Sequence, residues 1–257
     1  MEKILISIVT HNSEDIFRTL DVLAHEIGQD DRFKVVVYDN ASETNYCKRL
    51  VKYSFIELIC AKENQGFGHG HNQVILNSQA EYAFICNPDI LVTKETLLHM
   101  RQLIERENIV AVSPKVLNED GTTQYLVRQR LSVFDYFLRF IPFKKMKQLF
   151  DRRLSAYECR DLPDDKCSII KMGSGCFMLV SVAAYKQIAG FDERFFMYFE
   201  DNDFCLRLNQ TGGQILYSPF DQVVHLYGKG AHRNRKLFLI FMQSMFKFFN
   251  KWGWKWF

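Results

Sequence analysis

Residues 82–89 read YAFICNPD, a short apolar run that stops at a proline followed by an acid. This pattern is typical of a buried strand in a parallel sheet, because such a strand is covered on both faces and ends at turn residues. Pro88 cannot donate to a sheet ladder, so the strand ends before it and Asp89 is presented at the sheet edge. A carboxylate there is a candidate oxygen ligand for a divalent cation.

Other apolar runs repeat this pattern on either side, and amphipathic segments follow them. They are Ile4 to Val9, Val35 to Tyr38, Phe55 to Ala61 and Val110 to Val112. Strands that alternate with helices predict an α/β fold with a mostly parallel sheet and helices on both faces. The length of 257 residues and the hydrophobic content of 47% predict one soluble globular unit.

Polar residues follow each run, at the edge where such sheets bind ligands. They are Thr10-His11-Asn12, Asp39 to Ser42, Glu63 to Gly68, and Asn87-Pro88-Asp89. Structural alternatives are that Asn12 and Ser13 cap a helix and that Asp39 to Ser42 form a capped turn. The glycines at 66, 68 and 70 permit close approach to a ligand. Their GxGxG spacing differs from GxGxxG, which disfavours a nicotinamide cofactor.

A second informative stretch is FFMYFEDNDFCLR at residues 195–207, where an aromatic run delivers three acids to the start of a predicted helix. The acids are Glu200, Asp201 and Asp203. The macrodipole favours carboxylates in a first helical turn, so a well-capped helix is the structural interpretation. Aromatic side chains beside a carboxylate exclude water and raise its proton affinity, which favours a functional acid.

The net charge of +3 is unevenly distributed. Residues 128–153 hold eight Lys or Arg against two Asp, and residues 228–257 hold seven against none, so the remainder is acidic. Both basic segments are rich in aromatic residues, a combination that suits an anionic membrane surface, with amphipathic core helices as the alternative. Their uncharged apolar runs are too short to span a bilayer, and the acidic remainder disfavours nucleic-acid binding.

The seven cysteines are scattered and form no CxxC pair, which disfavours a zinc site and indicates free thiols. The N-terminal MEKILISIVTHN carries a short apolar run that predicts a buried strand instead of a signal peptide. We therefore expect a cytoplasmic location.

Seven motifs in order resemble family 2 glycosyltransferases, and most closely the bacterial rhamnosyltransferases that build O-antigen and cell-wall polysaccharides. The motifs are SIVTHN (7–12), VYDNAS (37–42), ENQGFGHGHNQ (63–73), NPD (87–89), SGCFMLV (174–180), GFDERFFMYFEDNDFCLRL (190–208) and VVHLYGKG (223–230). The resemblance extends from residue 4 to about residue 230.

The resemblance implies a GT-A fold, a nucleotide-sugar donor, a divalent cation (Mg or Mn) and inversion at the anomeric carbon. It assigns nucleotide contacts to Thr10, Asn12 and Asp39, and the donor pocket to Asn64, Gly66, Asn72 and Asn87. It assigns the metal site to Asp89 and His225, the general base to Asp201, and acceptor contacts to Glu200 and Asp203. Family members often carry an acid where this chain has Asn87, which implies a modest metal affinity.

The resemblance also implies a catalytic domain over 1–230, with a donor half at 1–115 and an acceptor half at 165–230. The segment 231–257 is expected to be an amphipathic, membrane-associating helical tail. The implied donor is dTDP-L-rhamnose, with UDP-hexoses as the alternative. The implied acceptor is a polyprenyl-diphosphate-linked sugar, used by a peripheral enzyme on the inner face of the cell membrane in polysaccharide biosynthesis.

Two other classes remain open at this point. A Rossmann-type oxidoreductase would require NAD(P)H binding, which the glycine spacing disfavours. A non-catalytic membrane-binding adaptor would not need Asp89 and Asp201.

Overall fold

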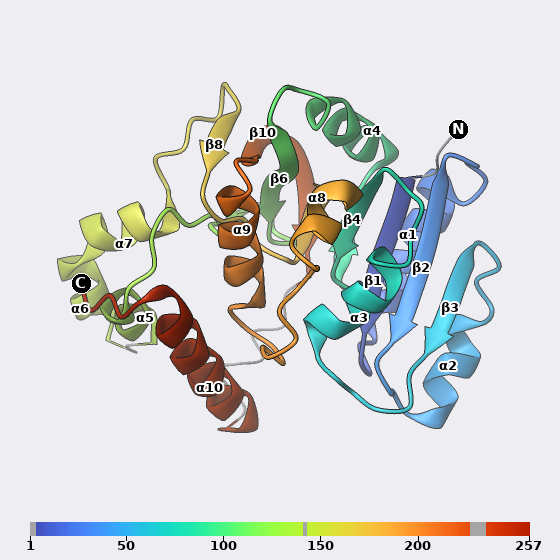
Figure 1. Cartoon of the computed structure of the whole chain (residues 1–257), viewed down its shortest axis with the longest axis horizontal. Coiled ribbons are helices and arrows are strands. Elements are labelled where there is room, and N and C mark those ends of the chain that lie inside the picture. Colours follow the sequence, from blue (N-terminus) through green and yellow to red (C-terminus); the bar gives the residue numbers. More distant parts are fainter. Residues whose placement is uncertain (1–3, 141–142, 227–234) are drawn as a thin grey trace.

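The computed structural model describes residues 4–140, 143–226 and 235–257, and it shows a central sheet flanked by helices (Figure 1). The strands are β1 Ile4–Thr10, β2 Phe33–Asp39, β3 Ile56–Cys60, β4 Tyr82–Cys86, β5 Ile90–Leu91, β6 Ile109–Leu117, β7 Thr123–Gln124, β8 Ser168–Ile170, β9 Phe177–Ser181 and β10 Gln214–His225. The helices are α1 Asp15–Ile27, α2 Thr44–Leu50, α3 Phe67–Ile75, α4 Lys94–Leu103, α5 Val133–Phe140, α6 Lys144–Leu149, α7 Asp151–Glu158, α8 Val182–Gln187, α9 Glu200–Gln210 and α10 Arg235–Trp252. The predicted α/β fold is confirmed.

The sheet has the strand order β3-β2-β1-β4-β9-β6-β10-β5, with β7 paired to β6 and β8 paired to β10. Its N-terminal half is parallel, as predicted, because β1 pairs in parallel with both β2 and β4, and β2 with β3. β9 lies antiparallel between β4 and β6, so the C-terminal half is mixed. No helix directly follows β6, where the sequence pattern predicts one. The chain turns back into β7 instead.

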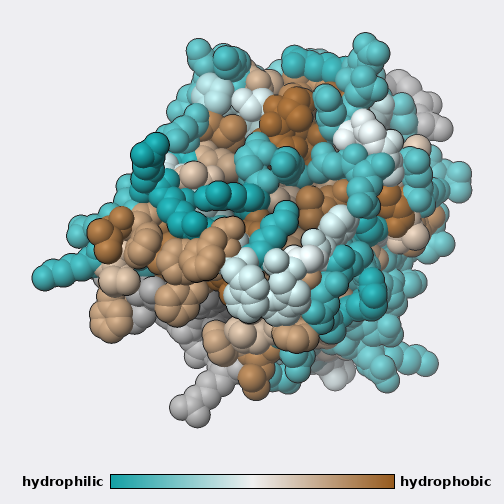
Figure 2. All heavy atoms as spheres, turned by 60° about the vertical axis from the view of Figure 1, so that its left-hand side comes forward, coloured by the Kyte–Doolittle hydropathy of each residue, from teal (hydrophilic) through white to brown (hydrophobic). Residues whose placement is uncertain are grey.

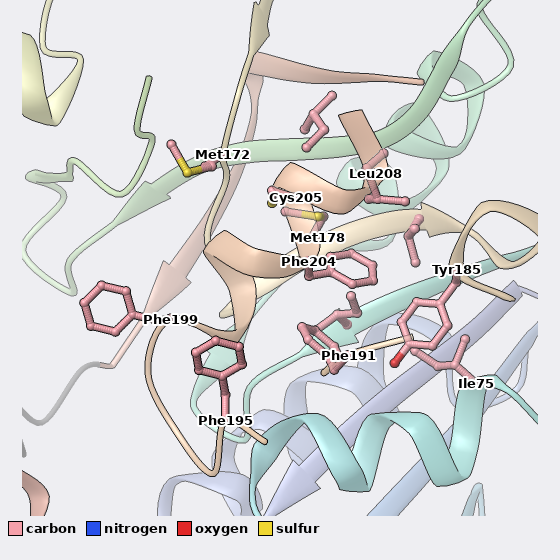
Figure 3. Close-up of a cluster of buried hydrophobic side chains, with 14 of the residues drawn as sticks. Ile75, Met172, Met178, Tyr185, Phe191, Phe195, Phe199, Phe204, Cys205 and Leu208 are labelled. Carbon is pink, nitrogen blue, oxygen red and sulfur yellow. The ribbon is translucent and has the colours of Figure 1, made fainter. Parts of the chain in front are cut away.

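Helices cover both faces of the sheet. One core lies beneath α1, α2 and α4, where α1 turns Ile16, Leu20 and Leu23 inward at helical spacing. The other core lies beneath α3, α8 and α9 and extends to α5, α7 and α10. Figure 3 shows the aromatic part of this second core, in which the rings of Phe191 and Phe204 stack at a centroid distance of 4.6 Å. This core supports the stretch that carries the acids.

The predicted C-terminal helix exists as α10, and it packs against the second core of the fold. Four of its side chains are buried in the second core: Phe241, Met245, Phe248 and Phe249. Ser244 donates a hydrogen bond of 2.7 Å to the carbonyl of Met197, just before the acids. One face of this helix therefore belongs to the core, which is the alternative interpretation of the segment, and its association with a membrane stays a prediction. The expected boundary at residue 230, and the end of the motif at 223–230, lie outside the described residues.

Two phenylalanines of α10 provide a matched test of this packing. Phe249 is 1% exposed, whereas Phe246 is 55% exposed. We expect Phe249→Ala to lower the free energy of unfolding by about 3–5 kcal/mol, because it leaves a cavity in the core. Phe246→Ala should change it by less than about 0.5 kcal/mol. Denaturant unfolding measures both, and equal small effects would show that α10 does not stabilise the fold.

Candidate active site

A cavity of about 500 Å³ lies beyond the ends of β4 and β10, against the first turn of α9. Its lining brings together five of the predicted site residues, which lie far apart in the sequence: Asn87, Asp89, Glu200, Asp201 and His225. Side chains of α5 and α10 complete the wall.

The wall that carries Asp89 is built by the pairing of β5 with the end of β10. His225 pairs with Ile90, and the N–H of Leu226 donates to the carbonyl of Asp89 at 2.9 Å. The Oδ1 atom of Asp89 lies 3.3 Å from Nε2 of His225 and is buried without a hydrogen bond among the described residues. Asn87 Nδ2 lies 3.5 Å from the same Nε2.

Gln124 sets the orientation of the His225 ring. Its Nε2 donates to the carbonyl of His225 at 2.9 Å, and its Oε1 lies 3.0 Å from Nδ1 of the ring. An amide oxygen only accepts, so Nδ1 carries the proton and, in the neutral ring, Nε2 presents a lone pair on the Asp89 side. An imidazole nitrogen and a carboxylate oxygen therefore face each other.

The acids at the start of α9 are placed by a turn with unusual backbone angles. Tyr198 and Phe199 have φ values of 71° and 67°, in the left-handed region that aromatic residues rarely adopt. Such strain persists only where the surroundings enforce it, and it is frequent at functional sites. The ring of Phe199 is buried and lies 4.8 Å from that of Tyr136. The turn directs Glu200 and Asp201 into the cavity.

The carboxylate of Asp201 is held by three N–H donors. Its Oδ2 accepts from the backbone of Gly175 at 3.2 Å, and its Oδ1 accepts from the backbone and side chain of Asn202 at 2.7 and 2.8 Å. Oε2 of Glu200 is buried without a hydrogen bond among the described residues. The two neighbouring acids thus have different environments.

This difference separates their protonation states. Burial raises the pKa of Asp201, while the N–H donors of Gly175 and Asn202 and the charge of Arg128 oppose the rise. Burial and then the negative charge of Asp201 raise the pKa of Glu200 well above its usual range. We infer that a proton resides on Glu200 and that Asp201 is the carboxylate. Gly175 and Asn202 donate three hydrogen bonds to Asp201, whereas the backbone N–H of Glu200 opposes burial and the charge of Asp201 only in part.

The predicted nucleotide contacts lie at the adjacent ends of β1 and β2. Thr10 Oγ1 lies 2.6 Å from the hydroxyl of Tyr46. Oδ2 of Asp39 accepts from the N–H of Ser42 at 3.2 Å and from the thiol of Cys47 at 3.0 Å. Oδ1 of Asp39 is buried without a hydrogen bond among the described residues. A turn is therefore present, but one carboxylate oxygen remains for a ligand.

Asn12 connects two loops at this edge. Its N–H donates to Ser42 Oγ at 2.7 Å, and its Oδ1 accepts from the N–H of Glu43 at 2.9 Å. The N-cap of α1 is Glu14, and it makes no side-chain capping bond. The interpretation of Asn12 and Ser13 as helix caps is therefore wrong.

The glycine-rich loop is shaped by contacts within the protein. Oδ1 of Asn64 accepts from the N–H of Gly66 at 3.0 Å. Gly66 has a φ of 98°, and a Cβ atom there would lie 2.3 Å from the carbonyl oxygen of Phe196. Only glycine fits, and its close approach is to the acid-bearing segment. This corrects the expectation that the glycines serve approach to a ligand, since Gly68 also packs closely against Phe191.

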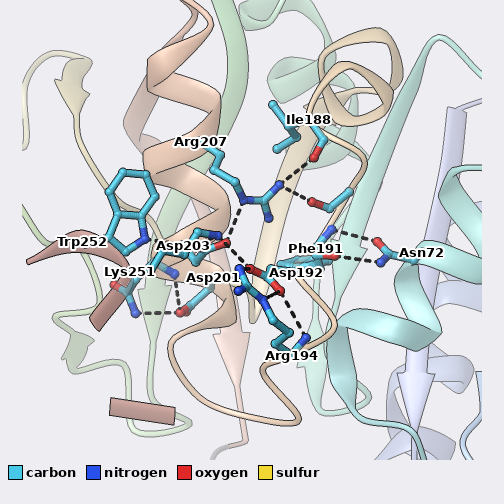
Figure 4. A network of polar contacts seen from close by, with 12 residues as sticks. Asn72, Ile188, Phe191, Asp192, Arg194, Asp201, Asp203, Arg207, Lys251 and Trp252 are labelled. Carbon is cyan, nitrogen blue, oxygen red and sulfur yellow. Dashed lines mark hydrogen bonds and ion pairs between the residues drawn. The ribbon is translucent and has the colours of Figure 1, made fainter. Parts of the chain in front are cut away.

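Asn72 and Asp203 do not line the cavity but belong to the network of polar contacts drawn in Figure 4. Asn72 holds the loop before the acids: its Oδ1 accepts from the hydroxyl of Tyr185 and the N–H of Phe191, and its Nδ2 donates to the carbonyl of Phe191 and to Glu193. Its hydrogen-bonding capacity is filled, so its assignment to the donor pocket is wrong.

Asp203 is fully buried and joins α9 to α10. Its carboxylate lies 2.7 Å from Nε of Arg207 and 2.6 Å from Nζ of Lys251, and it accepts from Nε1 of Trp252 at 2.8 Å. The assignment of Asp203 to acceptor binding is therefore wrong.

The sequence-based prediction missed most of the cavity lining, including the polar residues Gln124, Arg128 and Tyr157. Arg128 belongs to the basic segment 128–153, yet it is buried in the cavity wall instead of facing a membrane. Gln124 and Tyr157 carry no sequence signal that distinguishes them from other polar residues.

Comparison with known proteins identifies the family. The profile of "Glycosyl transferase family 2" matches residues 5–188, and that of "N-terminal domain of galactosyltransferase" matches residues 169–229. The chain is 26% identical over 245 residues to rhamnosyltransferase WbbL of Escherichia coli K12, covering 91% of this chain and 86% of that protein. It is 26% identical over 206 residues to N-acetylglucosaminyl-diphospho-decaprenol L-rhamnosyltransferase of Mycobacterium tuberculosis, covering 74% of this chain and 66% of that one.

Among solved structures, the fold is similar to mannosyltransferase PcManGT of Pyrobaculum calidifontis in complex with GDP-Man and Mn²⁺. The TM-score is 0.67 at 17% identity, and the match covers 97% of this chain and 64% of that one. The expected GT-A fold is confirmed. With the family profile spanning more than half of its length, the chain belongs to glycosyl transferase family 2.

Proposed function

We propose that this chain is an inverting glycosyltransferase that moves L-rhamnose from dTDP-L-rhamnose to a lipid-linked saccharide in surface polysaccharide biosynthesis. The observation that carries the proposal is one cavity lined by Asp89 and His225 and also by Asp201. Displacement at an anomeric carbon needs neutralisation of the leaving group and a base for the attacking hydroxyl. The two relatives named as rhamnosyltransferases support the donor sugar.

The nucleotide binds, in this proposal, at the ends of β1 and β2. The buried Oδ1 of Asp39 offers an acceptor for a base N–H or a ribose hydroxyl, and Thr10 adds a hydroxyl beside it. Asn12, Asn64 and Gly66 shape the loops around this pocket.

The residues at the cavity wall that carries Asp89 and His225 fit a divalent cation. Oδ1 of Asp89 is a buried carboxylate oxygen without a hydrogen bond among the described residues, and His225 directs Nε2 toward it. These are ligand types that Mn²⁺ and Mg²⁺ sites use. The ion would supply positive charge to the leaving diphosphate. Because Asn87 is neutral, the protein contributes little negative charge there, and we expect metal affinity to depend on the donor diphosphate.

Asp201 takes the proton from the acceptor hydroxyl as that oxygen attacks the sugar. Its N–H donors from Gly175 and Asn202 hold the carboxylate in place, and protonated Glu200 donates a hydrogen bond to the acceptor. A direct displacement inverts the anomeric carbon and needs no covalent nucleophile, so no cysteine takes part.

The raised pKa of Asp201 predicts the acid side of the pH profile. The base works only when ionised, so activity is lost as pH falls through its pKa, which burial raises above the ordinary value of 3.8. We therefore expect the acid limb of kcat/KM to lie above pH 3.8. The measurement is kcat/KM against pH, restricted to the range in which circular dichroism shows the protein folded. A profile that stays flat down to pH 3.8 would contradict the role of Asp201.

We further propose that the enzyme is peripheral to the membrane, with 1–230 as the catalytic part and α10 as a packed C-terminal addition. Several apolar side chains of α5, α6 and α10 are exposed: Phe137, Met146, Leu149, Phe238, Leu239, Met242 and Phe246. These helices belong to the two basic segments, residues 128–153 and 228–257, whose positive charge favours binding to anionic lipid. Among the described residues, no helix has the length and apolar character needed to cross a bilayer. Equal binding to neutral and anionic vesicles would contradict an electrostatic contribution.

Thermal unfolding with a panel of nucleotide sugars tests the donor. At equal concentrations, a ligand that binds only the folded state raises Tm more when it binds more tightly. We expect dTDP-L-rhamnose with Mn²⁺ to raise Tm most and UDP-hexoses to raise it less. A larger shift with a UDP-hexose would favour the alternative donor.

A further inference from the structure

Arg128 is a buried cation with no acid at ion-pair distance among the described residues, and Asp201 of the same cavity is the acid on which its charge acts. Its side chain is only 7% exposed, and Nη1 donates to the carbonyls of Tyr125 and Val127 at 2.7 and 2.6 Å. The guanidinium lies 4.3 Å from the ring centroid of Tyr157. Arg128 takes part in none of the ion pairs between residues that the structure describes. Buried charges in proteins are normally paired, so this environment favours an anionic ligand.

A second arginine lines the same cavity. Arg139 lies on α5, three residues after Tyr136, and both side chains reach the cavity wall together with Phe241 of α10. Asp89 and His225 come from the separate β5–β10 pair. The cavity therefore has two places where a phosphate could bind. At one, a cation held by Asp89 would contact the phosphate; at the other, the guanidinium groups of Arg128 and Arg139 would contact it.

The elements that carry this arginine wall also expose apolar side chains. Phe137, on α5 next to Tyr136, is 59% exposed, and Leu239 of α10 is 61% exposed. The backbone N–H of Val133 donates to the carbonyl of Lys255 at 2.8 Å, which ties α5 to the C-terminal residues. Figure 2, in which this side of the molecule is turned forward, shows hydrophobic side chains gathered on its surface. A cationic cavity wall and an apolar outer face thus share the same helices.

We propose that Arg128 and Arg139 bind the diphosphate of a lipid diphosphate-linked acceptor and that the exposed apolar side chains of α5 and α10 contact its hydrocarbon chain. Guanidinium groups bind phosphate oxygens through paired hydrogen bonds, and an anion with an apolar chain matches both features of this wall. The identity of the acceptor rests on the proposed function, whereas the binding of a prenyl diphosphate does not.

Isothermal titration with farnesyl diphosphate tests the subsite without catalysis. Saturating dTDP and excess chelator keep the probe from the donor site. We expect Arg128→Gln and Arg139→Gln each to weaken binding by about 10- to 100-fold, the size expected for a hydrogen bond to a charged group. Arg130→Gln is the matched control, because Arg130 is exposed and lies two residues from Arg128. Arg128→Lys keeps the charge and should retain more affinity than Arg128→Gln.

Kinetics then separate this subsite from the donor site. For the arginine variants, KM should rise more for a lipid diphosphate-linked saccharide than for the same saccharide on a neutral alkyl chain. Equal increases for both acceptors, or wild-type farnesyl diphosphate affinity in both folded Gln variants, would overturn the proposal. If no donor and acceptor pair gives transfer, the proposed function fails, and the titration still decides the subsite.

Discussion

Asp201→Asn should lower the rate of sugar transfer by about two to four orders of magnitude, because the substitution keeps the shape of the side chain and removes the proton acceptor. Donor affinity should change little, since Asp201 lies in the cavity and not among the nucleotide contacts at the ends of β1 and β2. Single-turnover transfer and donor titration measure the two quantities separately.

Asp203→Asn is the matched control. Asp203 is buried in ion pairs with Arg207 and Lys251 and does not line the cavity. Its substitution should therefore reduce stability, by about 3–5 kcal/mol as for other broken buried pairs. Turnover per folded molecule should remain near that of the wild type. If Asp201→Asn retained wild-type turnover, the role of base would pass to Glu200.

Asp89→Ala should abolish metal-dependent donor binding, and chelation should abolish transfer by the wild type. The physical reason is that the leaving diphosphate then lacks its counter-charge, a contribution of several kcal/mol to the transition state. Titration of the donor with and without Mn²⁺ measures the effect on binding.

Asn87→Asp should raise the metal affinity that Asp89→Ala lowers. Asn87 Nδ2 lies 3.5 Å from His225 Nε2, so a carboxylate at this position would add a negative charge beside the proposed ligands. We expect tighter Mn²⁺ binding in this variant. For the chelation test, full activity of the wild-type enzyme in excess chelator would contradict the metal site. It would show that side chains alone neutralise the diphosphate.

The parallel half of the sheet could be predicted because each strand is a short apolar run, ended by polar residues. The stretch YAFICNPD, for example, places β4 and Asp89 correctly. The mixed half could not be predicted, since β9 lies between β4 and β6 although it comes after both in the sequence. Local patterns carry no information about such pairing.

The wrong assignments of Asn72 and Asp203 also arise because local sequence patterns do not show long-range contacts. Asn72 and Asp203 have the residue types that ligands require, but their partners Tyr185 and Lys251 lie far away in the sequence. Those contacts satisfy the side chains within the protein. The aromatic and basic pattern of α10 favours a membrane surface, with a core helix as the alternative. Only the packing of side chains such as Phe249 shows that one face of the helix is buried.

The proposed reaction in this cavity is the transfer of L-rhamnose with inversion. The most direct test is to incubate the protein with dTDP-L-rhamnose, Mn²⁺ and a lipid diphosphate-linked GlcNAc, and to determine the anomeric configuration of the product by NMR. We expect a rhamnosyl product whose configuration is opposite to that of the donor. A product with retained configuration, or no transfer of rhamnose to any saccharide acceptor, would contradict it.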